Sequence, residues 1–232
     1  MSNTISLRIK RRSVTKFLTL CALTLIVIHS MILILYFWIG DPNTFDFVRL
    51  FDLDMERNIP TVFSSSLLLI ASFLFYLRSK VAGEKQTGLQ GYWIGLCVVF
   101  AFLGFDEGAK IHEQVGDLTS EYFSIVNQYE IFPWVFAYGI SLFGLTAVYI
   151  RFFLCISRSL FKRLMIAAAI YLSGAIGFDM LGGYLSAHYG IASVPYSLAY
   201  TVEESLEMFG VIYLIDLLLA ELDLSKILIH SS

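Results

Sequence analysis

Long apolar runs separated by short polar segments extend over most of the chain. A helix needs about 20 apolar residues to cross the roughly 30 Å of hydrocarbon in a bilayer. On this measure the pattern predicts about six transmembrane helices, which form one domain over residues 17–220. The predicted spans lie near residues 17–39, 61–77, 90–113, 132–154, 163–186 and 197–220. The predicted fold class is therefore an all-α, polytopic membrane helical bundle.

The basic residues predict how this bundle is oriented. All but three of the 16 lysines and arginines occur in four segments that six spans would place on one side of the membrane. These segments are residues 1–16, 78–91, 151–163 and 221–232. Positive side chains concentrate on the cytoplasmic side of membrane proteins. Both termini, with their tails 1–16 and 221–232, are therefore predicted to be cytoplasmic.

Composition supports a membrane environment and limits the partners. Hydrophobic residues make up 57% of the chain and charged residues only 15%, and the mean hydropathy is +0.73. These values exclude an ordinary soluble domain. The net charge of -3 gives no support for nucleic-acid binding. The predicted partner is the lipid bilayer, together with a lipid-like small molecule if the protein is an enzyme.

The third predicted span carries acidic residues before its apolar run is long enough to cross the bilayer. The run 92–105 covers only about 21 Å at 1.5 Å per residue, and Asp106 and Glu107 follow at once. One interpretation ends the helix before these two residues and leaves them at the surface. The shortness of the run favours a helix that continues through them, with Lys110 and Glu113 on the face of Asp106.

The sixth and fifth predicted spans repeat this pattern. Glu203, Glu204 and Glu207 lie within a run that requires them to reach crossing length, and Glu203 and Glu207 share one helix face. Asp179 stands in the segment 173–183, whose glycines predict close packing against another helix. Three separate spans therefore carry carboxylates inside their apolar runs.

The helical rise places these carboxylates at one height. Asp106 and Glu107 lie roughly 21 to 23 Å from the cytoplasmic edge, and Asp179 lies at about the same depth. Residues 203–207 lie roughly 9 to 15 Å below the outer edge. Each unpaired carboxylate near the bilayer centre costs on the order of 3 kcal/mol, and Lys110 alone supplies a nearby positive charge. The carboxylates must therefore be neutralised by protons, a metal ion or water.

A divalent metal ion is the first hypothesis, since carboxylates with histidine suit Zn, Mn, Fe or Ca. The predicted metal ligands are Asp106, Glu107, His112, Glu113, Asp179, Glu204 and Glu207. If the site belongs to a metal-dependent enzyme acting on a lipid-like substrate, Glu203 is the predicted catalytic base. The pattern departs from di-iron bundles, because no histidine has an acidic residue three positions before it.

Two other classes of function stay open at this point. A proton- or cation-coupled transporter or channel would use the same carboxylates as a relay. It requires a polar route to the cytoplasmic face, where the spans are nearly all apolar except for Asp216, which is predicted to snorkel. An accessory subunit would pair these carboxylates with a partner's basic residues. His29 is predicted to be a hydrogen-bonded core residue rather than a ligand.

Four motifs carry a resemblance to a known family. They read FDLDxExNxPTxFSS over residues 51–65, DExxxxHE over 106–113, DMLGG over 179–183 and EExxEM over 203–208. Together they resemble an uncharacterised family of multi-pass bacterial membrane proteins. The resemblance implies a location in the bacterial inner membrane. It implies no activity, substrate or catalytic residue.

Overall fold

A computed structural model describes residues 4–5, 10–39, 49–55, 57–84, 87–122, 133–222 and 229–230. Its main elements follow one another as β1 (Thr4–Ile5), α1 (Arg11–Ile39), α3 (Ile59–Glu84), α4 (Gln90–Ala109), α5 (Ile111–Tyr122), α7 (Pro133–Cys155), α8 (Arg158–Leu172), η2 (Ser173–Phe178), α9 (Asp179–Tyr189), α10 (Val194–Glu221) and β2 (Ile229–His230). The two-residue strands β1 and β2 pair antiparallel. Of the predicted tails 1–16 and 221–232, the structure describes residues 4–5, 10–16, 221–222 and 229–230.

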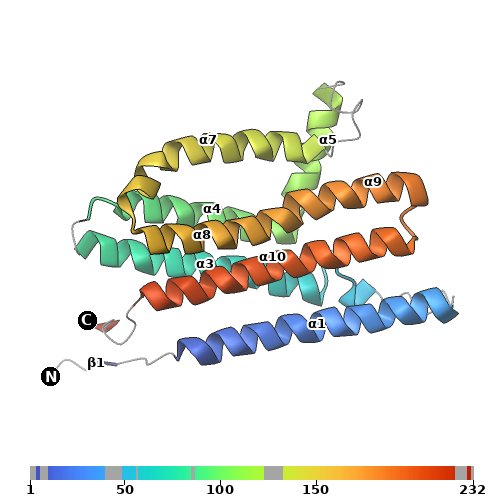
Figure 1. Cartoon of the computed structure of the whole chain (residues 1–232), viewed down its shortest axis with the longest axis horizontal. Helices are drawn as coiled ribbons and strands as arrows, with labels where there is room; N and C mark the ends of the chain where they lie inside the picture. Colours follow the sequence, from blue (N-terminus) through green and yellow to red (C-terminus); the bar gives the residue numbers. More distant parts are fainter. Residues whose placement is uncertain are drawn as a thin grey trace.

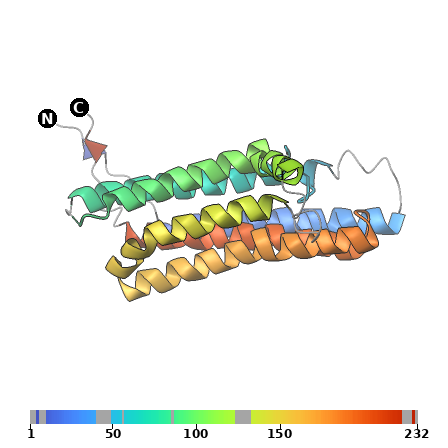
Figure 2. The same cartoon turned by 90° about the horizontal axis from the view of Figure 1, so that it is seen from above.

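The helices lie lengthwise beside one another and form an elongated bundle (Figures 1 and 2). Five of them are long and apolar enough to cross a membrane. These stretches are Arg11–Trp38, Ile59–Glu84, Gln90–Ala109, Ala137–Cys155 and Arg158–Tyr189. The predicted all-helical membrane bundle is confirmed to this extent. The sixth predicted span corresponds to α10, whose several acidic residues set it apart from these five, so the count of six stays a prediction.

Both chain ends lie at the same end of the bundle, which we call the terminal end (Figure 1). The opposite end carries the loop of residues 49–58 between α1 and α3, and we call it the loop end. Placing both termini at one end requires an even number of passes along the bundle. The count of spans and the cytoplasmic side of the termini stay predictions.

Helix α10 occupies the centre of the bundle, where it packs against α1, α3, α8, η2 and α9. Its second half forms the core, because Ile215, Leu217 and Leu218 are fully buried there. Helix α1 packs chiefly against α10 and exposes a long apolar face. A helix that carries several acidic residues is thus the helix against which most of the others pack.

The predicted third span is interrupted at Lys110. Helix α4 ends at Ala109, Lys110 adopts a left-handed conformation with φ of 56°, and α5 turns away to pack on α7 (Figure 1). The backbone N–H of Lys110 donates to the carbonyl of Asp106 at 2.8 Å, which closes α4. The expectation that Lys110 and Glu113 continue the helix face of Asp106 is therefore wrong.

The predicted fifth span is continuous but not uniform. Six residues of η2 form a π-helical turn between α8 and α9. A Cβ atom at Gly174 would lie 2.6 Å from the carbonyl oxygen of Glu203, and one at Gly210 would lie 2.8 Å from the Tyr171 nitrogen. These two glycines let the fifth span and α10 approach closely, as the glycine pattern predicts for residues 173–183.

Candidate functional site

Five carboxylates from three elements gather beside the central helix, and we call them the acid cluster. They are Glu107 of α4, Asp179 of α9, and Glu203, Glu204 and Glu207 of α10. The Glu207 carboxylate interacts electrostatically with Glu107, Glu203 and Asp179. Glu203 interacts in the same way with Asp179, Glu204 and Glu107. The structure thus brings together five of the eight residues that the sequence singled out.

Close contact between η2 and α10 holds the cluster together. A Cβ atom at Gly174 would also lie 3.0 Å from Cγ of Glu207. A larger residue at position 174 would therefore displace the Glu207 side chain. The Tyr171 phenol makes a polar contact with Glu207 and lies near Glu107 and Glu204. The sequence analysis did not select Tyr171. Its spacing from Gly174, one helical turn along the same face, is the signal that could have identified it.

The cluster continues towards the loop end through Asp54. This exposed residue interacts electrostatically with Glu203, and its Oδ1 accepts a hydrogen bond of 2.8 Å from the Tyr196 hydroxyl. In the opposite direction the α10 side chains Met208, Val211 and Leu214 are apolar and buried. Within the described part of the chain, the acid cluster is therefore continuous with an exposed carboxylate at the loop end and bounded by apolar core towards the terminal end.

Asp106 and His112 form a separate pair. The Asp106 Oδ1 atom accepts the backbone N–H of His112 at 2.6 Å and lies 3.3 Å from Nδ1 of its ring. The Tyr138 hydroxyl of α7 donates to the other oxygen at 2.9 Å. The turn at Lys110 creates this arrangement, because it brings the start of α5 back to the last turn of α4. The side chain of Glu113 lies outside the described residues.

Metal coordination is not prearranged in the described residues. Among them, no group of three or more His, Cys, Asp or Glu side chains is placed to hold a metal ion. The carboxylates of the acid cluster interact with one another, yet a coordination shell would require them to move closer together. Protons bound to individual carboxylates require no such movement. The cluster can therefore take up protons as it stands, or a cation after side-chain rearrangement.

His29 is a core residue, as expected. Its side chain is 1% exposed, and its Nδ1 atom accepts the backbone N–H of Leu53 at 3.2 Å. Its Nε2 atom lies 3.1 Å from Oγ1 of Thr201, so Nε2 carries the proton and donates to that oxygen. An accepting Nδ1 means a neutral ring. The 3.6 Å approach of Asp52 to Nδ1 is accordingly not an ion pair.

The loop of residues 49–58 is held to the bundle by its own polar groups. The Asn58 side chain caps α3 by accepting the N–H of Thr61 at 3.1 Å. Its amide donates to the carbonyl of Asp52 at 2.6 Å. The Tyr200 phenol makes a polar contact with the Asp52 carboxyl. Burial raises the pKa of Asp52 to about 6. The first motif thus specifies a folded loop; its residue Glu56 lies outside the described residues.

Asp216 lies near the terminal end, where it joins α1 to α10. Arg11 donates from Nε to Oδ1 at 2.7 Å and from Nη2 to Oδ2, and the Thr15 hydroxyl donates to Oδ1 at 2.8 Å. The Nη2 atom of Arg163 is 3.9 Å from the carboxylate. Asp216 therefore pairs with arginine instead of simply snorkelling, and buried apolar residues separate it from the acid cluster.

Comparison with known proteins identifies a family whose description states no activity. The family model described as "Domain of unknown function (DUF8692)" matches residues 17–222. No curated protein and no solved structure matches the chain.

Proposed function

Since this chain belongs to the DUF8692 family, whose description assigns no function, we propose its function from the acid cluster. The protein is a multi-pass membrane protein in which Glu107, Asp179, Glu204 and Glu207 bind a divalent cation. The cation enters from the loop end, past Asp54. Zn, Mn, Fe and Ca are the ions that carboxylate ligands suit.

The observation that supports this proposal is the convergence of five carboxylates from α4, α9 and α10 in one place. Like charges at such distances repel one another, and burial makes their ionisation more costly. A cation bound between them would remove both penalties at once. The side chains of Glu204 and Glu207 carry enough rotatable bonds to move from electrostatic range into coordination distance.

The proposal includes the membrane in which the protein lies and the reaction that the site would carry out in an enzyme. The resemblance through the four motifs supports the bacterial inner membrane, and the distribution of basic residues supports cytoplasmic termini. In an enzyme, a lipid-like substrate would meet the cation from the bilayer. Glu203 would be its general base, because this carboxylate lies next to the entry at Asp54.

A second candidate is supported by the absence of a prearranged metal group among the described residues. In this case bound protons, rather than a metal ion, neutralise the acid cluster. The Tyr171 phenol beside Glu207 is a suitable neutral partner for a protonated carboxyl. The buried apolar side chains of Met208, Val211 and Leu214 weigh against a continuous route for ions through the bundle.

Metal analysis of the purified protein in lipid nanodiscs tests the first candidate. We expect wild-type protein to retain one divalent ion and Glu207→Gln to lose it, because this substitution removes one charged ligand. Glu84→Gln is the matched control, since Glu84 is exposed at the far end of α3. It should retain the ion.

Folded wild-type protein that holds no metal and takes up none of the four ions would contradict the metal site. Infrared spectra then decide the second candidate. A protonated-carboxyl band that disappears in Glu207→Gln supports bound protons, whereas identical spectra reject them as well.

A further inference from the structure

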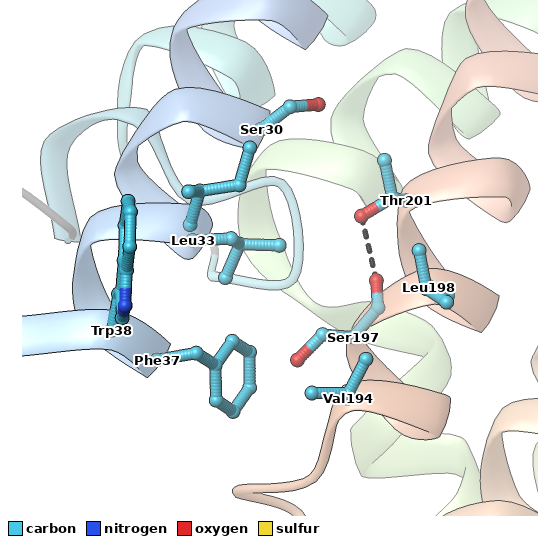
Figure 3. A pocket seen from close by; sticks show the side chains of 9 residues that line it. Ser30, Leu33, Phe37, Trp38, Val194, Ser197, Leu198 and Thr201 are labelled. Atoms are coloured by element: carbon cyan, nitrogen blue, oxygen red, sulfur yellow. Dashed lines mark hydrogen bonds between the residues drawn. The ribbon is translucent and has the colours of Figure 1, made fainter.

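A groove lies between α1 and α10 at the loop end of the bundle, apart from the acid cluster (Figure 3). Its volume is about 460 Å³, within the range of small-molecule sites in proteins. Helix α1 contributes Ser30, Leu33, Ile34, Phe37 and Trp38, and α10 contributes Val194, Ser197, Leu198 and Thr201. The two sets of side chains face each other across the groove (Figure 3).

Two polar side chains of the groove already form hydrogen bonds within the protein. The Ser30 hydroxyl donates to the carbonyl of Ile26 at 2.7 Å. The Thr201 hydroxyl donates to the carbonyl of Ser197 at 2.6 Å, and its oxygen accepts from His29. Among the described residues, no charged side chain lines the groove. A polar headgroup would therefore find few hydrogen-bond partners inside the groove, whereas a hydrocarbon chain requires none.

One wall of the groove has the character of a lipid-facing helix. Its first wall, α1, is long and apolar enough to cross a membrane and packs chiefly on α10. Trp38, at the end of this wall, is 87% exposed. Exposed tryptophan at the end of an apolar helix is typical of the boundary between hydrocarbon and headgroups. The character of α1 and the exposure of Trp38 therefore favour a groove that begins at that boundary and opens to the hydrocarbon.

The length of the groove matches one leaflet. From Ser30 to Trp38, the wall extends about 12 Å at 1.5 Å per residue. The hydrocarbon of a single leaflet is roughly 15 Å deep, half of the total thickness. One extended chain that enters beside Trp38 would therefore fill the groove without reaching the opposite leaflet.

We propose that this groove binds one hydrocarbon chain of a membrane lipid, with the lipid headgroup near Trp38. The proposal does not depend on the cation site, because no groove-lining residue belongs to the acid cluster. It assigns a binding site for an acyl or isoprenoid chain to the contact between α1 and α10.

Photo-labelling tests the proposal. The protein is reconstituted in dioleoylphosphatidylcholine vesicles that contain a phosphatidylcholine with a diazirine in one acyl chain, and labelled residues are mapped by mass spectrometry. We expect labelling of Leu33, Phe37 and Leu198 several-fold above that of Phe143, although Phe143 on α7 is 79% exposed. A bound chain stays beside its groove, whereas surrounding lipid exchanges over every exposed face.

Two variants fill the groove from opposite walls. Leu198→Trp and Ile34→Trp replace exposed side chains with larger ones, and both should abolish most of the excess labelling. Val148→Trp is the matched control, because Val148 is similarly exposed on α7 and outside the groove. It should label like wild type. Labelling in proportion to exposure, or unchanged labelling in both folded variants, would mean surrounding lipid only and would overturn the proposal.

Discussion

At the scale of single residues, hydrogen bonds rather than charges fix the loop of residues 49–58. The Nδ1 atom of His29 accepts a hydrogen bond from the backbone N–H of Leu53, and its Nε2 atom donates one to the Thr201 hydroxyl. The Asn58 side chain caps α3 and also donates a hydrogen bond to the Asp52 carbonyl within the loop. Asp52 is buried among these groups, and its surroundings favour the protonated carboxyl. The loop should therefore respond to pH through this one residue.

The raised pKa of Asp52 sets the sign of that response. Because the folded protein holds this proton more tightly than the unfolded chain, the free energy of unfolding should fall as the pH rises from about 3.8 to about 6. Above that window the loss is complete, and it amounts to at most about 3 kcal/mol.

Thermal unfolding in detergent over a pH range that extends below and above this window measures the effect as the difference between wild type and Asp52→Asn. The variant should lack this part of the slope, whereas Glu84→Gln should keep it. Equal slopes in wild type and Asp52→Asn would show that Asp52 titrates alike in the folded and unfolded chains.

At the scale of elements, close approach between η2 and α10 builds the acid cluster. Gly174 faces the backbone of Glu203 and the side chain of Glu207, whereas a Cβ atom at Gly177 would meet nothing within 4 Å. The two glycines lie in the same π-helical turn. They provide a matched pair that separates the effect of contact from the effect of the residue type.

Gly174→Ala should destabilise the protein by about 1–3 kcal/mol, because its methyl group would overlap α10. Gly177→Ala should leave the stability nearly unchanged or slightly higher. Melting temperatures of the two variants in the same detergent provide the comparison. Similar melting temperatures would show that the contact at Gly174 can relax at little cost.

The sequence predicted the elements better than their interruptions. Apolar runs fixed the approximate helix bounds, and the acids inside those runs indicated the face that becomes the cluster. The end of α4 at Ala109 could not be read from hydrophobicity, because it depends on Asp106 accepting the N–H of His112. Asp54 was likewise missed as a neighbour of Glu203, since that contact joins residues far apart in the chain.

At the scale of the whole molecule, the polar groups are unevenly distributed along the bundle. The acid cluster, the loop of residues 49–58 and the His29 network lie towards the loop end, whereas an Arg11–Asp216 ion pair joins two helices near the terminal end. Buried apolar side chains of α10 separate the two regions. A molecule of this kind should present different chemistry to the two sides of its membrane.

Labelling of single introduced cysteines tests this sidedness. Arg57 precedes α3 and Glu84 is its last residue, and both side chains are exposed. In intact cells a membrane-impermeant maleimide should label Arg57→Cys but not Glu84→Cys, and lysis should make the second accessible. Wild-type protein, with Cys21, Cys97 and Cys155, gives the background. Equal labelling of both variants before lysis would reject a bundle that spans the membrane in this direction.

The π-helical turn of η2 has a consequence for how Asp179 is aimed. A π-helical turn usually contains one residue more than an α-helical turn, and each residue rotates an α-helix by about 100°. Asp179, the residue that follows η2, therefore points in a direction set by that additional residue upstream. If the same residues of η2 formed an ordinary α-helical turn, the whole of α9 would be rotated about its axis and this carboxylate would lie out of register with α10, while every side chain in the protein's acidic centre kept its identity.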